Sequence, residues 1–219
     1  MATVLVTGGN RGIGLALAQR YAERGDRVYI TSRDPGIPLP EGVHGVLPLD
    51  VRDQSSIDAL ARRLEGERLD VLLNNAGVLE RNTLEALNLD SIRFQFEVNA
   101  LGPLRVTSAL RGCLGQGSKV GIVTSRMGSV ADNTSGSHYG YRMSKAAVNM
   151  AGKSLAVDLA PEGVALRLLH PGYVKTGMTG FRGNWGPDEA SKGLVACMDA
   201  LTLAKTGEFW HASGEPLPW

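Results

Sequence analysis

The sequence has little cysteine: its 219 residues include only Cys113 and Cys197. The two are far apart along the chain, and neither belongs to a Cys-x-x-Cys motif or to a cluster with histidine. This spacing excludes the common cysteine-based metal motifs and offers no disulfide framework. We therefore expect two reduced, structural thiols in a reducing compartment and no metal site, with a single disulfide as the alternative.

The sequence also lacks an excess of charge of either sign. Lys and Arg total 23 and Asp and Glu total 22, which leaves a formal net charge of +1, and the basic residues form no block. This balance excludes the charge patterns that are typical of proteins that bind nucleic acids or anionic membranes. The partner that we expect is a small molecule.

Long apolar runs and repeats are missing as well. No run reaches the length that crosses a bilayer, and the N-terminus shows no basic segment followed by an apolar core. We therefore predict a cytoplasmic protein. With 219 residues, 43% of them hydrophobic, and no low-complexity linker, the chain is sized for one domain that spans residues 1–219.

The first turn of the chain joins an apolar strand, a glycine-rich loop and the start of a helix. Residues 4–15 read VLVTGGNRGIGL. Gly8, Gly12 and Gly14 stand where a tight turn requires positive φ and where the backbone approaches a phosphate or the neighbouring helix. Their spacing differs from the commonest dinucleotide fingerprint, so an ordinary strand-turn-helix is the alternative.

Apolar strands alternate with helices along the whole chain. The predicted strands begin at Thr3 and continue at 27–32, 43–49, 69–73, 119–124, 164–170 and 207–211. Helices are predicted from Leu15 to Gly25, after a cap at Asp53, from Asp90 toward Cys113, around Tyr141 until Pro161, and over 188–205. This alternation predicts an α/β fold: one Rossmann-type, doubly wound parallel sheet of about seven strands, with helices on both faces.

The end of the second predicted strand indicates which dinucleotide is bound. An acid at this position accepts hydrogen bonds from the ribose of NAD, whereas a basic residue accommodates the extra phosphate of NADP. The strand ends in Ser32-Arg33, and Arg11 reaches from the glycine loop. We therefore favour NADP(H) over NAD(H). A solvated turn residue is the alternative for Arg33, and Asp34 would favour NAD if the strand were shifted.

Polar residues follow other strands, at the edge of the sheet where ligands bind in open α/β folds. Asp50 ends the third strand, and Asn74-Asn-Ala-Gly77 follows the fourth. Turn formation is the alternative for the asparagines, because Asn readily bonds its own neighbouring backbone. Asn99 interrupts the apolar face of a helix, and a buried asparagine needs hydrogen-bond partners.

Tyr141 and Lys145 stand four residues apart on one predicted helix, so they project from the same face. A nearby ammonium favours the phenolate and lowers the pKa of a tyrosine from its usual value of about 10. Ser125 ends the preceding strand and can hydrogen-bond a carbonyl oxygen while Tyr141 donates a proton. An ordinary loop serine is the alternative for Ser125 and Ser129.

These motifs together resemble the short-chain dehydrogenase/reductase family, and the likeness covers nearly the whole chain. The matching motifs are, in order, TGGNRGIG from Thr7 to Gly14, Asp50-Val51, NNAG from Asn74 to Gly77, Asn99, Ser125, Tyr141-x-x-x-Lys145, and Pro171-Gly172 with Thr176. Within the family, SRMGS from Ser125, YRMSKAA from Tyr141 and the closing GEPLPW are similar to the C-factor and Sniffer-type carbonyl reductases.

The resemblance implies a role for each matching residue. It implies that Tyr141 is the acid/base, Lys145 binds the nicotinamide ribose, Ser125 orients the substrate carbonyl and Asn99 holds a water in the proton relay. The cofactor-binding residues that it implies are Gly8, Asn10, Arg11, Gly12, Ile13, Gly14, Arg33, Asp50, Val51, Asn75, Ala76, Gly77, Tyr141, Lys145, Pro171, Gly172, Val174 and Thr176. The expected substrate pocket includes Arg126, Met127, Met178 and Trp185, with a small substrate loop at about 177–187.

Two features depart from the family's pattern. The interval from Ser125 to Tyr141 is longer than usual, so Ser129 is an alternative for the serine role, although Gly128 fits the usual context of Ser125. The stretch after Thr176 is short, which implies an open substrate pocket.

The function that we expect is NADPH-dependent reduction of a ketone or aldehyde by a homodimer that pairs through its two long helices. The main alternative is a nucleotide-binding signalling or regulatory protein of the C-factor type with little turnover. An epimerase or dehydratase on the same fold is a third possibility, less well supported because the sequence has no substantial C-terminal substrate domain.

Overall fold

A computed structural model describes all residues, 1–219, and is built around one seven-stranded sheet. The strand order is β3-β2-β1-β4-β5-β6-β7, and every neighbouring pair is parallel. The strands are β1 (Thr3–Val6), β2 (Arg27–Ser32), β3 (Gly45–Pro48), β4 (Val71–Asn74), β5 (Lys119–Val123), β6 (Ala165–His170) and β7 (Glu208–His211). The predicted single-domain, doubly wound fold is confirmed.

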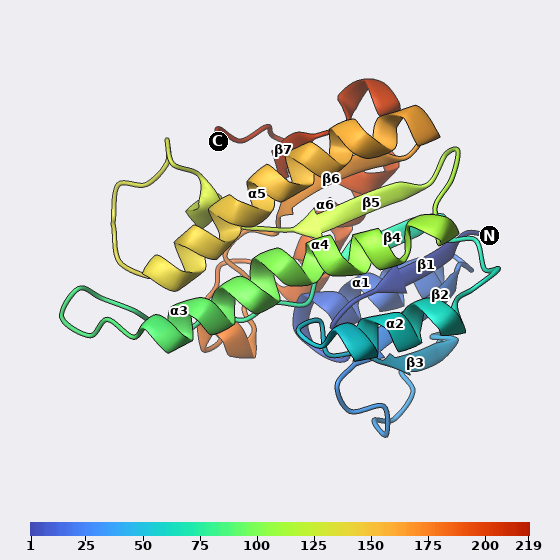
Figure 1. The fold of residues 1–219 in the computed structure, drawn as a ribbon, viewed down its shortest axis with the longest axis horizontal. Helices are drawn as coiled ribbons and strands as arrows, with labels where there is room; N and C mark the ends of the chain where they lie inside the picture. The colour runs from blue at the N-terminus through green and yellow to red at the C-terminus, as the bar shows by residue number, and fades with distance from the viewer.

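Helices cover both faces of the sheet (Figure 1). One face carries α2 (Gln54–Arg63), α3 (Leu89–Phe96), α4 (Gly102–Ala109) and α5 (Tyr139–Leu159), and the other carries α1 (Gly12–Glu23) and α6 (Pro187–Asp199). Because successive strand side chains point to opposite faces, Leu5 joins the core under α2, α4 and α5, whereas Val4 and Val6 join the core under α1 and α6.

The topology gathers the loops that follow the strands at one end of the molecule, opposite the N-terminus (Figure 1). The chain winds outward through β1, β2 and β3 and then returns to place β4 on the other side of β1. The strand order therefore reverses between β1 and β4, and ligands bind at such a reversal in open α/β sheets. The glycine loop follows β1, and Asn75 follows β4.

The predicted helix from Asp90 toward Cys113 is not one regular helix. Residues Glu97–Leu101 form a π-helical turn between α3 and α4, and a 3₁₀ turn at Arg111–Cys113 follows α4. A π turn inserts one residue into an otherwise α-helical segment, and such turns are frequent at functional sites. The prediction at Asp53 is confirmed, since its carboxylate caps α2 by accepting a hydrogen bond from the Ser55 N–H at 3.0 Å.

Other predicted boundaries differ by a few residues. The last predicted helix, 188–205, ends at Asp199, because buried Leu201 turns the chain inward, and only a 3₁₀ turn follows at Leu203–Lys205. The third strand is predicted over 43–49, but β3 covers only Gly45–Pro48. The fourth, predicted over 69–73, is shifted to Val71–Asn74.

Both cysteines are buried and free. Cys113 belongs to the core on one face of the sheet and Cys197 to the core on the other. The sheet thus separates the two sulfurs, which excludes the alternative of a disulfide between them. No helix is both long enough and apolar enough to span a bilayer.

Candidate functional site

The glycine loop after β1 has the backbone that the sequence predicts. Gly8 and Gly12 have φ of 63° and 56°. Gly14 is required by close approach, because a Cβ there would lie 2.3 Å from the Gly8 carbonyl oxygen and 2.4 Å from Asn75 Nδ2. Gly9, which sequence reasoning did not single out, presses against the side chain of Ile30.

The start of α1 fits an anionic group. Arg11, the residue that precedes α1, has an extended backbone, and its side chain does not cap the first turn of the helix. The first turn contains no acidic residue. Unpaired N–H groups and the positive end of the helix dipole therefore face the loop. Thr176 lies beside Gly12, Asn10 and Arg11 are exposed, and Ile13 packs partly on the core. These features are suited to a dinucleotide pyrophosphate.

The loops after β1 and β4 are locked together. The Thr7 hydroxyl oxygen accepts hydrogen bonds from the N–H groups of Asn75 at 2.9 Å and Ala76 at 3.0 Å. The Asn75 amide donates to the carbonyl oxygens of Thr7 at 3.0 Å and Gly8 at 3.1 Å. Asn74 instead faces the core and donates to the Thr107 hydroxyl. Asn75 thus braces the glycine loop, and Asn74 anchors α4.

Asn99 is fully buried in the π turn, and its amide is occupied by protein groups. Its oxygen accepts from the Val78 N–H, and its nitrogen donates to the Val78 carbonyl at 2.9 Å and to the Ser144 hydroxyl at 3.0 Å. Gly77 leaves room for this contact, because a Cβ there would come 3.2 Å from Asn99 Oδ1. The side chain therefore ties the loop after β4 to α5, and the expected role of Asn99 in holding a water stays a prediction.

The end of β2 places two arginines on the surface beside the glycine loop. The strand ends at Ser32, as predicted, and both Arg33 and Arg11 are exposed. Asp34 points back into its own turn, where its carboxylate accepts a hydrogen bond from the Gly36 N–H at 2.9 Å. Asp34 is exposed as well, and one of its carboxylate oxygens is occupied by this turn.

At the end of β3, Asp50 forms a two-pronged ion pair with Arg52, with atom distances of 3.0 Å and 2.6 Å. Hydrogen bonding to Arg52 holds the pKa of Asp50 below its ordinary value, with a smaller contribution from the charge of Arg33. Val51 is buried against Gly102, the first residue of α4. The Asp50-Val51 pair therefore lies beyond the carboxyl end of β3, at the edge of the sheet where ligands bind in open α/β folds.

Ser125 follows β5 and begins a 3₁₀ turn, Arg126–Gly128, in which its hydroxyl caps the Met127 N–H at 3.1 Å. Gly128 lies directly on α5: a Cβ there would come 2.6 Å from the Lys145 carbonyl carbon. This contact fixes Ser125 against the helix that carries Tyr141. Ser129, the alternative, is buried and uses its hydroxyl to hold the Asp132 N–H.

Tyr141 and Lys145 are both buried on the face of α5 that meets β5, with 8% and 4% of their surface exposed. The Lys145 ammonium lies 5.6 Å from the centre of the Tyr141 ring and donates to the Val123 carbonyl at 2.9 Å. A Cβ on Gly77 would come 3.8 Å from the same ammonium. Ser125, Tyr141 and Lys145 thus meet at the end of β5.

Burial dominates the protonation of this group. It raises the pKa of Tyr141 to about 12, although a hydrogen bond with Ser125 acts in the opposite direction. It lowers the pKa of Lys145 to about 8. The prediction that its cationic neighbour lowers the pKa of Tyr141 is therefore wrong for this structure, because desolvation disfavours phenolate and ammonium alike.

The Pro171-Gly172 segment follows β6 at the same edge of the sheet. Pro171 and Val174 are buried, and Gly172 has φ of 86° and abuts the rings of Trp185 and His211. The 3₁₀ turn Gly177–Thr179 follows Thr176. A β-bridge between Val174 and Trp185 then ties the predicted substrate loop back to this segment.

The four predicted pocket residues differ in their surroundings. Met127 is half-buried, and Met178 is exposed on the 3₁₀ turn. Trp185 packs edge-on against His211, with ring centres 5.2 Å apart. Arg126 is exposed and forms an ion pair with Asp132 at 3.2 Å. Trp185 is therefore partly structural, whereas Arg126 and Met178 leave an accessible rim.

Comparison with known proteins assigns the family. The family model described as short chain dehydrogenase matches residues 2–186. The chain is a short-chain dehydrogenase/reductase. The family model thus covers the glycine loop and the group at the end of β5.

Two curated proteins are similar to the chain over most of its length. The 1-hydroxy-2-glutathionyl-2-methyl-3-butene dehydrogenase of a Rhodococcus species is 43% identical over 226 residues and covers 100% of both chains. The C-signal protein of Myxococcus xanthus is 46% identical over 154 residues, which are 69% of this chain and 93% of that protein.

Solved short-chain dehydrogenase/reductase structures share the whole fold. The NADPH-bound carbonyl reductase from chicken fatty liver superposes with a TM-score of 0.90 at 29% identity, covering 100% of this chain and 99% of that one. The carbonyl reductase Sniffer of Drosophila melanogaster gives 0.91 at 29% identity and covers both chains fully. The resemblance to the C-factor and Sniffer-type proteins is confirmed, and the chain is an oxidoreductase of the carbonyl-reductase type.

Sequence reasoning assigned no structural role to three residues that shape the site: Thr7, Gly128 and Ser144. Thr7 is recognisable only as the residue before the glycine loop, and Gly128 only by its interval from Ser125. Ser144 gives a signal, because it is a polar residue inside the apolar face of α5 and must therefore find a partner.

The buried ammonium of Lys145 makes a prediction about stability and pH. Its pKa is lowered from 10.5 to about 8, so the unfolded state binds more protons between these values and the folded state gains stability as the pH rises. In urea unfolding, we expect the stability of the wild-type protein relative to Lys145→Met to rise by about 1–3 kcal/mol between pH 8 and pH 10.

The matched control is Lys192→Met on the exposed face of α6. Its stability difference from the wild-type protein should stay constant over the same pH range. A constant difference for Lys145→Met as well would contradict the desolvation of this ammonium.

Proposed function

We propose that the protein is an NADPH-dependent reductase of ketones or aldehydes that uses Ser125, Tyr141 and Lys145 at the reacting carbonyl. The observation that carries the proposal is the buried group itself. The Lys145 ammonium stands 5.6 Å from the centre of the Tyr141 ring, and Ser125, at the end of β5, is close enough to Tyr141 to lower its pKa. The group lies at the carboxyl edge of the sheet, beside the crevice that starts at the glycine loop.

The protonation of Tyr141 suits the direction of reduction. With a pKa of about 12 the phenol is protonated at neutral pH, so it can donate its proton to a carbonyl oxygen that gains negative charge. Ser125 supplies a second hydrogen bond to that oxygen, and the ammonium of Lys145 stabilises the phenolate that remains. The hydride for this step would come from the nicotinamide of bound NADPH.

The residues around the crevice support NADPH as the cofactor. Gly8, Gly12 and Gly14 would hold the pyrophosphate against the start of α1, with Asn75 bracing the loop. The exposed Arg11 and Arg33 would bind the phosphate on the adenosine ribose, because a guanidinium matches the geometry of a phosphate. Asp50 and Val51 would flank the adenine, and Thr176 beside Gly12 would meet the nicotinamide.

The substrate side of the site is open. Arg126, Met127 and Met178 would line its rim, and the loop 177–187 is too firmly tied by the Val174–Trp185 bridge to form a deep lid. The Rhodococcus relative is named for a substrate with a glutathionyl group. An open rim with an exposed arginine suits carbonyl compounds that carry a bulky polar substituent.

A regulatory function is the second candidate, favoured by the similarity to the C-signal protein of Myxococcus xanthus. In that case nucleotide binding matters and turnover does not. Both functions require the glycine loop, but only the reductase requires the Tyr141 hydroxyl. Loss of the biological effect in Tyr141→Phe with intact nucleotide binding would count against regulation.

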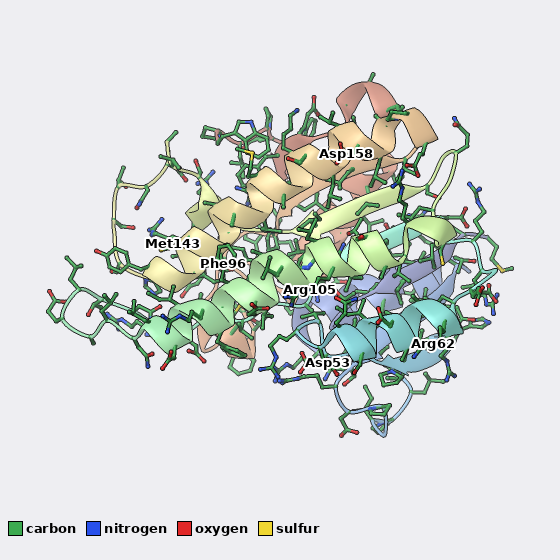
Figure 2. The ribbon with its side chains drawn as sticks, in the orientation of Figure 1. Asp53, Arg62, Phe96, Arg105, Met143 and Asp158 are labelled. Atoms are coloured by element: carbon green, nitrogen blue, oxygen red, sulfur yellow. The ribbon has the colours of Figure 1, made fainter.

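We also propose that two copies of the chain pair through α4 and α5. Met143, Met150 and Val157 repeat every seven residues on α5 and are 52%, 69% and 64% exposed. This interval is about two helical turns, so the three side chains form one stripe. Leu104 on α4 is also exposed, and Figure 2 shows Met143 and Phe96 of α3 on the same open face.

The Tyr141 hydroxyl provides the first test. In Tyr141→Phe, kcat with a reducible carbonyl panel should fall by at least about 100-fold, because the proton donor is lost. The NADPH dissociation constant should not change. Tyr139→Phe, two residues earlier on the same helix, is the control and should retain activity. Equal activity of the two variants would refute the catalytic role of Tyr141.

Arg33 provides the test of cofactor preference. Loss of one charged hydrogen-bond donor in Arg33→Ala should raise the NADPH dissociation constant by about 10- to 100-fold and leave that of NADH unchanged. Arg62→Ala, on the exposed face of α2 (Figure 2), is the matched control. Tighter binding of NADH than NADPH by the wild-type protein would refute the preference.

The exposed stripe on α5 provides the test of assembly. Sedimentation velocity should show a dimer for the wild-type protein and a monomer for Met150→Lys, since a charge would be buried without a partner. Leu84→Lys changes an equally exposed side chain away from the stripe and should remain dimeric. A monomeric wild-type protein at micromolar concentration would contradict the pairing.

A further inference from the structure

The closing GEPLPW motif is not used by the proposed chemistry, yet it is tightly placed. After β7 the chain turns at Gly214, which has φ of 90°, and runs back along the open side of this edge strand. The His211 N–H donates to the Glu215 carbonyl and the Leu217 N–H to the Phe209 carbonyl, both at 2.8 Å. Trp210 and Pro216 form an antiparallel bridge.

Trp219 extends this segment beyond the sheet. Its ring stacks on Phe209 of β7, with ring centres 5.5 Å apart and an interplanar angle of 30°. Its backbone carbonyl oxygen accepts a hydrogen bond from the Ala131 N–H at 3.0 Å. Figure 1 shows this end of the chain near the loop that precedes α5.

Ala131 belongs to the segment that begins with Ser125. In this segment the Gly128 N–H donates to the Ser125 carbonyl at 2.9 Å, and the Ser129 hydroxyl accepts from the Asp132 N–H at 3.2 Å. Asp132 in turn pairs with Arg126. The hydrogen bond from Ala131 to Trp219 therefore lies within the segment 125–132, whose other bonds extend back to Ser125.

Few other contacts hold the rest of this loop in place. Residues 130–136 are exposed, and the next two, Ser137 and His138, have φ of 50° and 52°. Left-handed backbone at two successive non-glycine residues is unfavourable and persists only where neighbours hold it. On the far side the loop is held by Arg142, which donates to Ser135 and to the Gly136 carbonyl. Trp219 holds the near side.

We propose that the segment 215–219 is a strap that positions Ser125, with Trp219 as its positioning residue. The aromatic ring anchors the strap to β7, and the Trp219 carbonyl holds Ala131 and with it the Ser125–Asp132 turn. The inference rests on the proposed function, in which Ser125 orients the carbonyl. A misplaced hydrogen-bond donor loses its stabilising effect on the transition state while the cofactor site stays intact.

The first test is hydrogen exchange, which requires no activity. In Trp219→Ala, peptides that cover residues 126–133 should exchange faster, while peptides of α2 should not change. Trp219→Phe keeps a ring that can stack on Phe209 and should restore the protection. Unchanged exchange of residues 126–133 in Trp219→Ala would overturn the strap, whatever the protein's activity.

The second test is kinetic. In Trp219→Ala we expect kcat/KM for the carbonyl to fall by about 10-fold, with an unchanged NADPH dissociation constant and recovery in Trp219→Phe. Tyr29→Ala, which removes a half-buried aromatic side chain near the opposite edge of the sheet, is the control for simple loss of stability and should keep its kcat/KM. An equal loss in both variants would show that Trp219 acts only through stability.

A failure of the proposed function itself gives a different result. In that case the wild-type protein reduces no carbonyl, and hydrogen exchange still reports on the strap. Faster exchange without any turnover would thus support the strap and refute the reductase.

Discussion

The site depends on the hydrogen bonds that join the loops after β1 and β4. Parallel strands leave the backbone groups beyond their carboxyl ends without ladder partners, so side chains must supply them. Thr7 accepts from the loop after β4, and Asn75 donates back to the loop after β1. Without this exchange the glycine loop would have no fixed partner on the far side of the crevice.

The same loop is connected to the catalytic helix by buried polar groups. Asn99 bonds Val78 on both its polar atoms and donates to Ser144, whose hydroxyl donates to the Tyr141 carbonyl at 2.9 Å. Satisfied buried networks of this kind are rigid, because each lost bond would leave a polar group without a partner. The cofactor crevice and Tyr141 are therefore held in one frame, although they come from distant parts of the sequence.

The sequence predicted the sheet and the backbone of the glycine loop, because both leave periodic or motif-like signals. Apolar strands between helices fix the fold class, and Gly8 and Gly12 mark a backbone that other residues rarely adopt. The π turn at Asn99 escaped prediction because the segment was interpreted as one continuous helix. A buried amide needs partners, but which groups Asn99 meets depends on the packing of α5, and local sequence does not specify them.

The pKa values of Tyr141 and Lys145 show a further limit of prediction from sequence. Their spacing on α5 correctly places the ammonium beside the ring, but the sign of the tyrosine shift depends on how much water reaches the pair. In the structure both groups are buried, and burial is the largest cause of both pKa shifts. A phenol that stays protonated at neutral pH can donate its proton to an acceptor, and the protonated form of the neighbouring lysine can then stabilise the phenolate.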